Sequence, residues 1–383
     1  MDRRNGERLA MSGSLCFAYR GLTVHIESDD PIHLWWLEEF LTPSFRPIER
    51  ARADYTVALT VDDQGYEATF RRGPCNDGRQ IDCFIFDSGP VCLPVWTSAG
   101  EECVVFDERC KTFYFVYREN AQIGILTASQ NWAARIALMR VVREIAMMHS
   151  WTTTSCIVHG AAFALGESGV LIAGPKGAGK TSLLIHSLQQ AGARFIANDR
   201  VVVDLAGAEP VLHGMPTIVT IRDQTLDLFP ELRQRLLQSR YNHRFALKET
   251  LPEGTFVAHP QRGRPTDLTP AQFCTLLDVD MREQSPVRTI LFPQVTGAHS
   301  GIHLQELSAQ AAGERLSAAL FGARSSQRMS SIFIPVSRSS SIDQTKLERL
   351  CMGLTAQARC VDCRLGQQAY QGHALTDFAP LYE

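Results

Sequence analysis

The stretch Gly174-Pro-Lys-Gly-Ala-Gly-Lys-Thr181 decides how the middle of this chain folds. It matches the pattern G-x-x-x-x-G-K-[ST] in full, in which a glycine-rich loop turns backbone N–H groups inward around a phosphate. We expect an apolar strand before it, at Val170–Ala173, and a helix after it, at Thr181–Gln190. The start of such a helix points its free N–H groups and the positive end of its dipole at the same anion. The segment therefore predicts a phosphate-binding loop between a strand and a helix.

Two side chains add chemistry to the backbone of this loop. Lys180 provides a full positive charge for the β and γ oxygens of a nucleoside triphosphate, and the Thr181 hydroxyl suits Mg²⁺. A flexible glycine-rich surface loop is the alternative interpretation, and the flanking strand and helix argue against it. The expected nucleotide-binding residues are Gly174, Pro175, Lys176, Gly177, Ala178, Gly179, Lys180, Thr181 and Ser182.

Asp199 and His159 are the candidate catalytic residues on either side of this loop in the sequence. Asp199 follows the predicted strand Arg194–Ala197, where an acidic residue either binds Mg²⁺ or accepts a proton from the attacking nucleophile. An ordinary aspartate of a turn is the alternative, because Asn-Asp-Arg is also favourable in turns. His159 lies in the predicted strand Cys156–Leu165, and a strand histidine taken alone is more often a core residue than a catalyst.

The remainder of the chain divides into a β-rich N-terminal part and a mixed C-terminal part. Residues 14–125 contain short runs of β-branched and aromatic residues separated by turn signals such as Asp62–Asp63. The runs that predict strands are Leu22–Ile26, Tyr55–Val61, Cys83–Phe86, Cys103–Phe106 and Thr112–Tyr117, and helices are expected near Ile32–Leu41 and at Asn131–His149. We therefore expect a β-rich α+β domain over residues 1–130 and an α/β domain over residues 131–383.

The segments that follow Asp199 alternate between helix and strand patterns. A proline- and glycine-rich loop is expected over residues 252–270. Helices are predicted at Gln224–Leu237, from Thr269–Pro270 onward, near Leu307–Leu320 and at Thr345–Thr355, with a strand at Arg288–Phe292.

Composition excludes several classes of protein. The chain has 383 residues, of which 45% are hydrophobic and 21% charged, and its net charge is −3, so that no global basic field indicates a nucleic-acid or membrane partner. Its 11 dispersed cysteines fit reduced thiols better than a disulfide framework, and the Cys360–Cys363 pair lacks further metal ligands nearby. With no signal peptide and no apolar run of membrane-spanning length, we expect a cytoplasmic protein.

The motifs together resemble the kinase domain of the bacterial HPr serine kinase/phosphorylase family. The resemblance is carried by His159-Gly160, the loop Gly174–Thr181 and the strand end Ala197-Asn198-Asp199-Arg200, with 21 residues from His159 to Lys180. It implies a P-loop kinase domain of the HPr kinase/PEP carboxykinase-like type, a mixed sheet with flanking helices. It also implies ATP, with GTP as the alternative, and Mg²⁺ held by Thr181 and Asp199.

The resemblance also implies roles for the candidate residues and shows two departures. Lys180 would hold the β and γ phosphates, Asp199 would be the general base, and His159 would orient it. The carboxylate that the family carries before an Ile-Arg pair is replaced by Thr220. The family's later catalytic arginine has no clear counterpart, with Arg244 and Lys248 as candidates.

The acceptor of the phosphoryl group stays open between three classes. The overall layout resembles HPr-kinase-like proteins found beside peptide-modification systems, including those that phosphorylate lasso-peptide precursors, which favours a serine of a peptide or small protein. A small-metabolite kinase would use the same residues, and an ATPase or nucleotide switch would use water. A binding module with a silent loop is a fourth alternative, which the intact motif disfavours. The resemblance also suggests a homo-oligomer.

Overall fold

The computed structural model divides into two compact units. One comprises Met1–Thr152 with Gln327–Ser341, and the other comprises Thr153–Ser326 with Ile342–Glu383. We call these unit 1 and unit 2. The structure describes residues 13–49, 52–87, 89–99, 102–239, 265–297, 301–321, 331–334, 344–366 and 368–370. The sequence pattern predicts a domain boundary between residues 130 and 131. The units instead divide after Thr152, because helix α4 (Ala134–Thr152) belongs to unit 1.

Unit 1 is built on a mixed sheet that has nine strands among its described residues. Strand β4 runs parallel to both of its neighbours, β2 and β9, and the other described pairings are antiparallel. In spatial order the strands are β3 (Arg46–Pro47), β1 (Ser14–Tyr19), β2 (Leu22–Ser28), β4 (Tyr55–Val61), β9 (Gln122–Thr127), β8 (Thr112–Tyr117), β7 (Glu102–Asp107), β6 (Val91–Ala99) and β5 (Gln80–Phe84). The strands expected at Tyr55–Val61 and Thr112–Tyr117 are confirmed.

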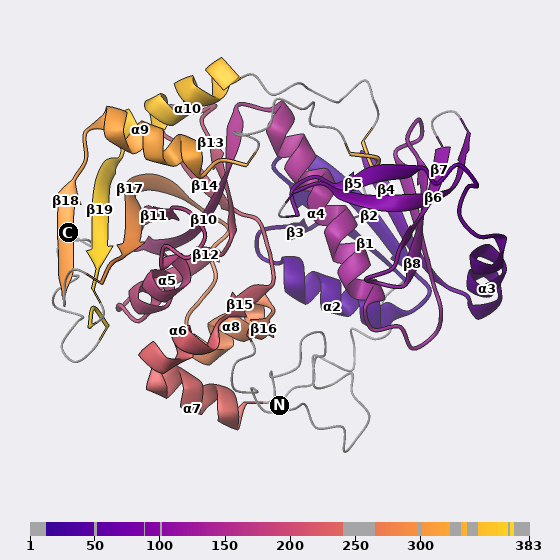
Figure 1. The fold of residues 1–383 in the computed structure, drawn as a ribbon, viewed down its shortest axis with the longest axis horizontal. Helices are drawn as coiled ribbons and strands as arrows, with labels where there is room; N and C mark the ends of the chain where they lie inside the picture. Colours follow the sequence, from indigo (N-terminus) through magenta and orange to yellow (C-terminus); the bar gives the residue numbers. More distant parts are fainter. Residues whose placement is uncertain are drawn as a thin grey trace. The chain divides into compact units, whose positions relative to one another are not determined.

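Two helices of unit 1 pack on each other and on this sheet. Helix α2 (Pro31–Leu41) contacts β1 and β2, and α4 contacts β2, β4 and β9 (Figure 1). The expected helices near Ile32–Leu41 and at Asn131–His149 are confirmed by α2 and α4. A third helix, α3 (Asp63–Arg72), lies where Asp62–Asp63 predicted a turn. Asp62 is its N-cap and accepts a hydrogen bond from the Gln64 N–H at 3.0 Å, a role that favours the same residue types as turns do.

Unit 2 is organised around the long strand β10 (Ser155–Leu165). Its first half pairs with β13 (Arg200–Asp204), and its second half pairs with β11 (Ser168–Ala173) and β12 (Ala193–Ala197). In its described part the sheet has eight strands, the others being β14 (Val211–Gly214), β17 (Gln284–Val295), β18 (Ile302–Glu306) and β19 (Arg359–Leu365). Strands β11, β17 and β19 run parallel, so that their carboxyl ends lie at one edge of the sheet.

Helices flank this sheet, which makes unit 2 a mixed α/β structure. Helix α5 (Lys180–Leu188) packs on β10, β11 and β12, and its buried Leu183, Leu184 and Leu188 join a core with Ile172. Figure 1 shows the helices α9 (Ala309–Ala318) and α10 (Gln344–Gln357) across the strands from α5. A small sheet of β15 (Val219–Ile221) and β16 (Thr266–Leu268) adjoins α6 (Asp223–Leu228), α7 (Pro230–Gln238) and α8 (Pro270–Leu277).

The expected single helix at Gln224–Leu237 is wrong, because α6 and α7 are separate. Pro230 starts α7, and a residue before proline is pushed out of the helical region, which fits the φ of −129° and ψ of 76° at Phe229. The helix start at Thr269–Pro270 is confirmed, with Thr269 and Gln272 forming a capping box. Within the expected loop at 252–270, residues 252–264 lie outside the described residues, and 266–268 form β16. None of the helices in the described part of the chain has the length and apolar composition that a membrane span requires.

Candidate active site

The phosphate-loop sequence folds into a tight connection between β11 and α5. The strand ends at Ala173 and the helix begins at Lys180. Gly177 and Gly179 have φ angles of 86° and 95°, in the left-handed region that favours glycine. A Cβ at Gly179 would also lie 3.1 Å from Cγ2 of Val295. The loop conformation thus depends on glycine at these positions, and it lies at the carboxyl edge of the parallel strands.

The other residues expected to bind nucleotide surround this turn. Pro175, Lys176 and Gly177 are exposed, Gly174, Ala178 and Ser182 are buried, and Gly179, Lys180 and Thr181 are half-buried. The first N–H groups of a helix have no acceptor within that helix. In α5 the bond from the Leu183 N–H to the Gly179 carbonyl, at 2.9 Å, is of the ordinary helical type, and the N–H groups of residues 180–182 precede it. The start of α5 can therefore offer backbone N–H groups to an anion resting on the loop.

The side chain of Lys180 bends back over its own loop. Its Nζ donates to the carbonyl oxygens of Gly174 and Pro175, at 2.8 and 2.9 Å. Burial lowers the pKa of Lys180 to about 8, and the negative charge of Asp199 acts in the opposite direction. The ammonium group is thus held at the loop, and it lies close enough to Asp199 to interact with that carboxylate.

Gly160 in strand β10 lies between the end of β11, which leads into the loop, and Asp199. Gly160 pairs with Ala173, the last residue of β11, and its N–H donates to the Asp199 carbonyl at 3.1 Å on the other side. Two strand spacings of roughly 4.8 Å put the backbones of Ala173 and Asp199 about 10 Å apart. A Cβ at Gly160 would lie 2.6 Å from the Ile172 carbonyl oxygen. Glycine at position 160 therefore permits this close arrangement.

Asp199 adopts an unusual backbone conformation between β12 and β13. Its φ is 71°, in the left-handed region, which aspartate tolerates better than most residues. The preceding carbonyl, of Asn198, accepts hydrogen bonds from the Thr217 hydroxyl at 2.6 Å and from the Arg200 N–H at 2.9 Å. The junction is thus fixed by its neighbours, and the strained residue is the one expected to be catalytic.

The carboxylate of Asp199 lies between a histidine and an arginine. His159 Nε2 is 3.2 Å from Oδ1, and Arg200 Nε is 3.8 Å from Oδ2. The Asp199 side chain is 41% exposed and the His159 side chain 35%, whereas that of Arg200 is 5% exposed. The structure thus places the three sequence-identified residues Lys180, Asp199 and His159 in one region. A carboxylate that is open to solvent and flanked by these groups can accept a proton from a bound hydroxyl.

Two residues of this region were not assigned a role from the sequence. Arg200 stands in the quoted motif, but its contact with Asp199 required the structure. Phe321, just after α9, has its ring centroid 5.7 Å from that of His159 and 5.5 Å from the Arg200 guanidinium carbon. No local sequence signal could have found Phe321, because it lies far along the chain from both partners.

The donors that the described residues offer to Mg²⁺ are few. They form no group of three or more His, Cys, Asp or Glu side chains able to hold a metal. Mg²⁺ at nucleotide sites usually keeps several waters and binds one or two carboxylates together with substrate phosphates. The Thr181 hydroxyl and the exposed Asp199 carboxylate fit that requirement. At the position where the resemblance leads one to expect a carboxylate, the Thr220 hydroxyl donates to Asp267 Oδ1 at 2.6 Å.

Other sequence candidates lie elsewhere or outside the described residues. Arg244 and Lys248 fall within residues 240–264, which the structure does not describe. Cys360 and Cys363 are buried in β19, where burial raises their pKa values to about 11 and about 12. Both thiols are therefore protonated at neutral pH and packed into the fold.

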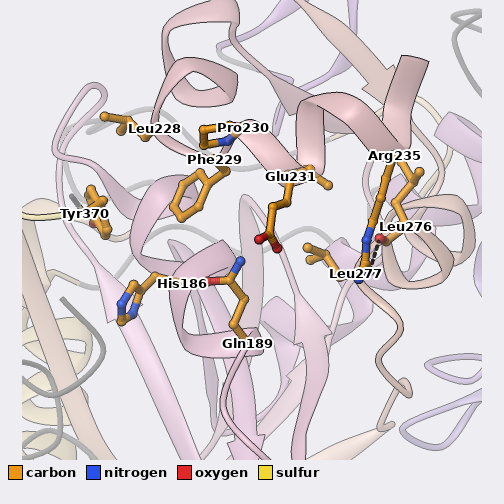
Figure 2. A pocket seen from close by; sticks show the side chains of 11 residues that line it. His186, Gln189, Leu228, Phe229, Pro230, Glu231, Arg235, Leu276, Leu277 and Tyr370 are labelled. Carbon is orange, nitrogen blue, oxygen red and sulfur yellow. Dashed lines mark hydrogen bonds between the residues drawn. The ribbon is translucent and has the colours of Figure 1, made fainter. Parts of the chain in front are cut away.

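A cavity lies at the opposite end of α5 from the phosphate loop. Its volume is about 680 Å³, and His186 and Gln189, from the end of α5, line it together with residues of α7 (Figure 2). The rings of His186 and Phe229 each lie near that of Tyr370, at 5.6 and 5.5 Å between centroids. Burial lowers the pKa of His186 to about 4, so its imidazole is neutral. The residues expected to bind nucleotide do not line this cavity.

No protein-family model matches the chain, and no curated protein matches it.

Proposed function

We propose that this chain is an ATP-dependent kinase of the HPr-kinase-like type that transfers the γ-phosphate to a hydroxyl group. The observation that carries the proposal is the position of Asp199 across Gly160 from the strand that leads into the phosphate loop. A phosphate-binding loop alone would serve any nucleotide-binding protein. A solvent-accessible carboxylate on a residue whose backbone lies about 10 Å from that of Ala173, roughly two strand spacings, is where an attacking hydroxyl would need a base.

The chain's own residues would bind and partly neutralise the phosphates during phosphoryl transfer. The backbone N–H groups of the loop and of the start of α5 would bind the phosphate oxygens, and Lys180 would leave the Gly174 and Pro175 carbonyls to contact the β and γ phosphates. Thr181 would hold Mg²⁺ together with the substrate phosphates, and the ion would supply further positive charge against them. Catalysis of this reaction consists largely of such positioning and charge neutralisation.

Asp199 would act as general base. The acceptor oxygen forms its bond to the γ-phosphorus as the bond to the β–γ bridging oxygen breaks, and the electron pair leaves with ADP. The hydroxyl proton passes to the Asp199 carboxylate, which His159 orients through its contact with Oδ1. A positioned base of this kind contributes about 10²–10⁴-fold in rate.

A large acceptor is favoured by the exposure of the catalytic pair. The side chains of His159 and Asp199 are 35% and 41% exposed, so the hydroxyl of a serine on a peptide or small protein can reach the base without entering a closed pocket. A small metabolite or water would use the same residues.

An acceptor screen tests the proposal. The protein is incubated with Mg-ATP labelled at the γ-phosphate and with a serine-peptide library, a small-protein panel or a set of metabolite alcohols, and products are identified by mass spectrometry. We expect label on peptide or protein serines, and no transfer by Lys180→Ala. Label appearing only as inorganic phosphate in every condition would contradict a kinase and indicate an ATPase.

A further inference from the structure

The segment that follows α9 is hydrogen-bonded directly to the strand that carries His159. The His159 N–H donates to the Ala319 carbonyl at 2.8 Å, and the Phe321 N–H donates to the Ile157 carbonyl at 2.9 Å. Leu320 and Val158 form a β-bridge between these two bonds. Residues 319–321 therefore extend the edge of β10 just before β11 begins its pairing at Gly160. Phe321 is held by this backbone pairing and not only by side-chain packing.

The ring of Phe321 contacts both groups that flank the Asp199 carboxylate. The His159 ring lies 5.7 Å from it at an interplanar angle of 39°, and the Arg200 guanidinium carbon lies 5.5 Å from its centroid. These two residues approach different oxygens of Asp199, Oδ1 and Oδ2. A cation over an aromatic face is attracted to it more strongly when it is desolvated, and the Arg200 side chain is almost fully buried. One ring thus restrains both partners of one carboxylate.

We propose that Phe321 is a positioning residue, which holds His159 and Arg200 so that they fix the orientation of the Asp199 carboxylate. The inference rests on the proposed function of Asp199 as base. His159 and Arg200 approach the two oxygens of Asp199, so the direction of the carboxylate depends on these neighbours. If the ring is removed, the imidazole and guanidinium can turn away and the carboxylate loses its alignment with a bound hydroxyl.

The position of Phe321 predicts an effect on turnover and not on nucleotide binding. Lys180 is held by the Gly174 and Pro175 carbonyls, and the turn of the loop depends on Gly177 and Gly179. These contacts do not include Phe321. A ring that only filled space would instead affect stability, with activity unchanged in the folded protein.

The test compares Phe321→Leu, which keeps an apolar side chain without the π face, with Phe321→Tyr, which restores the face. Phe273→Leu is the matched control, because Phe273 is buried on α8 and its ring packs on Phe195 at 5.5 Å. Three quantities are measured on the full chain: kcat for transfer from Mg-ATP, the Kd of Mg-ATP by calorimetry, and the NMR signal of the His159 imidazole. The His159 signal is assigned with His159→Gln and reports the ring directly, without any turnover.

We expect Phe321→Leu to shift the His159 signal and lower kcat about tenfold, since small misplacements of reacting groups cost up to about 100-fold, while Kd stays within twofold. Phe321→Tyr should restore both readouts, and Phe273→Leu should leave both as in the wild type. An unchanged His159 signal in Phe321→Leu overturns the inference, whatever the activity. A shifted signal with wild-type kcat also overturns it, as does an equal loss of kcat in Phe273→Leu. If the wild-type protein binds Mg-ATP but transfers no phosphate, the proposed function is contradicted. This outcome is seen in the wild type alone and is therefore distinct from a failure of the Phe321 inference.

Discussion

Gly160 donates its backbone N–H to the Asp199 carbonyl at 3.1 Å, and on its other side it pairs with Ala173 at the entrance to the phosphate loop. One residue without a side chain therefore joins the two halves of the candidate site. Its neighbour His159 provides the imidazole that approaches the Asp199 carboxylate. The structure thus explains both residues of the pair His159-Gly160: the histidine contacts the carboxylate, and the glycine allows the close approach of the strands.

Substitution Gly160→Ala should destabilise unit 2. A Cβ there would lie 2.6 Å from the Ile172 carbonyl oxygen, so β10 and β11 must separate. We expect a loss of about 1–3 kcal/mol in the free energy of unfolding, the usual cost of overpacking, measured by urea denaturation. Gly353→Ala on α10 is the control, because a Cβ there meets no atom within 4 Å, and it should be neutral or stabilising. Equal stability of the two variants would show that the strands are not in close contact at Gly160.

The affinity for Mg-ATP should fall as pH rises through the pKa of Lys180. Burial lowers that pKa from 10.5 to about 8, so the ammonium group loses its proton in the folded protein at a lower pH than in an unfolded chain. At about one unit above the pKa only roughly a tenth of the group is charged, and we expect binding to weaken up to about tenfold between pH 7 and pH 9. Calorimetry in buffers of matched ionic strength measures this.

Two variants control the pH experiment. Lys180→Ala should bind weakly with little dependence on pH over this range, because the titrating group is gone. Lys176→Ala removes an exposed lysine of the same loop and should keep the wild-type slope. If the pH dependence disappears in Lys176→Ala and persists in Lys180→Ala, the titrating group is Lys176, which would contradict the role given to Lys180.

Helix α3 in unit 1 should depend on its N-cap. Asp62→Ala removes the acceptor for the Gln64 N–H, and we expect a loss of about 1 kcal/mol from the free energy of unfolding. Asp62→Asn keeps an oxygen at the cap and should lose much less. Thermal unfolding followed by circular dichroism distinguishes the two, and identical melting curves would mean that the cap does not stabilise α3.

Local signals in the sequence predicted the glycine-rich turn between β11 and α5 and the strands and helices around it. The glycines and Lys180 lie within eight consecutive residues, and the flanking β11 and α5 follow from apolar periodicity. Two predictions of local structure were wrong because one residue type is compatible with two structures. Asp62 favours a turn and a helix cap equally, and Pro230 both interrupts the expected helix and starts a new one.

The remainder of the site depends on contacts between distant residues, which single-sequence patterns do not contain. Asp199 has its left-handed conformation at the junction between β12 and β13, which both pair with β10, and Phe321 lies against His159 because residues 319–321 pair with that strand. The assignment of α4 to unit 1 likewise follows from its packing on β2, β4 and β9. Helix periodicity predicted α4 but could not say which sheet it covers.

The most direct measurement compares transfer by wild-type and Asp199→Asn protein in single turnovers, with Mg-ATP affinity measured on the same samples. Asparagine also tolerates the left-handed backbone at this position, so the fold is kept while the base is lost. The account predicts a fall of about 10²–10⁴-fold in the transfer rate with little change in Kd. Transfer at the wild-type rate by Asp199→Asn would contradict the assignment of Asp199 as the base.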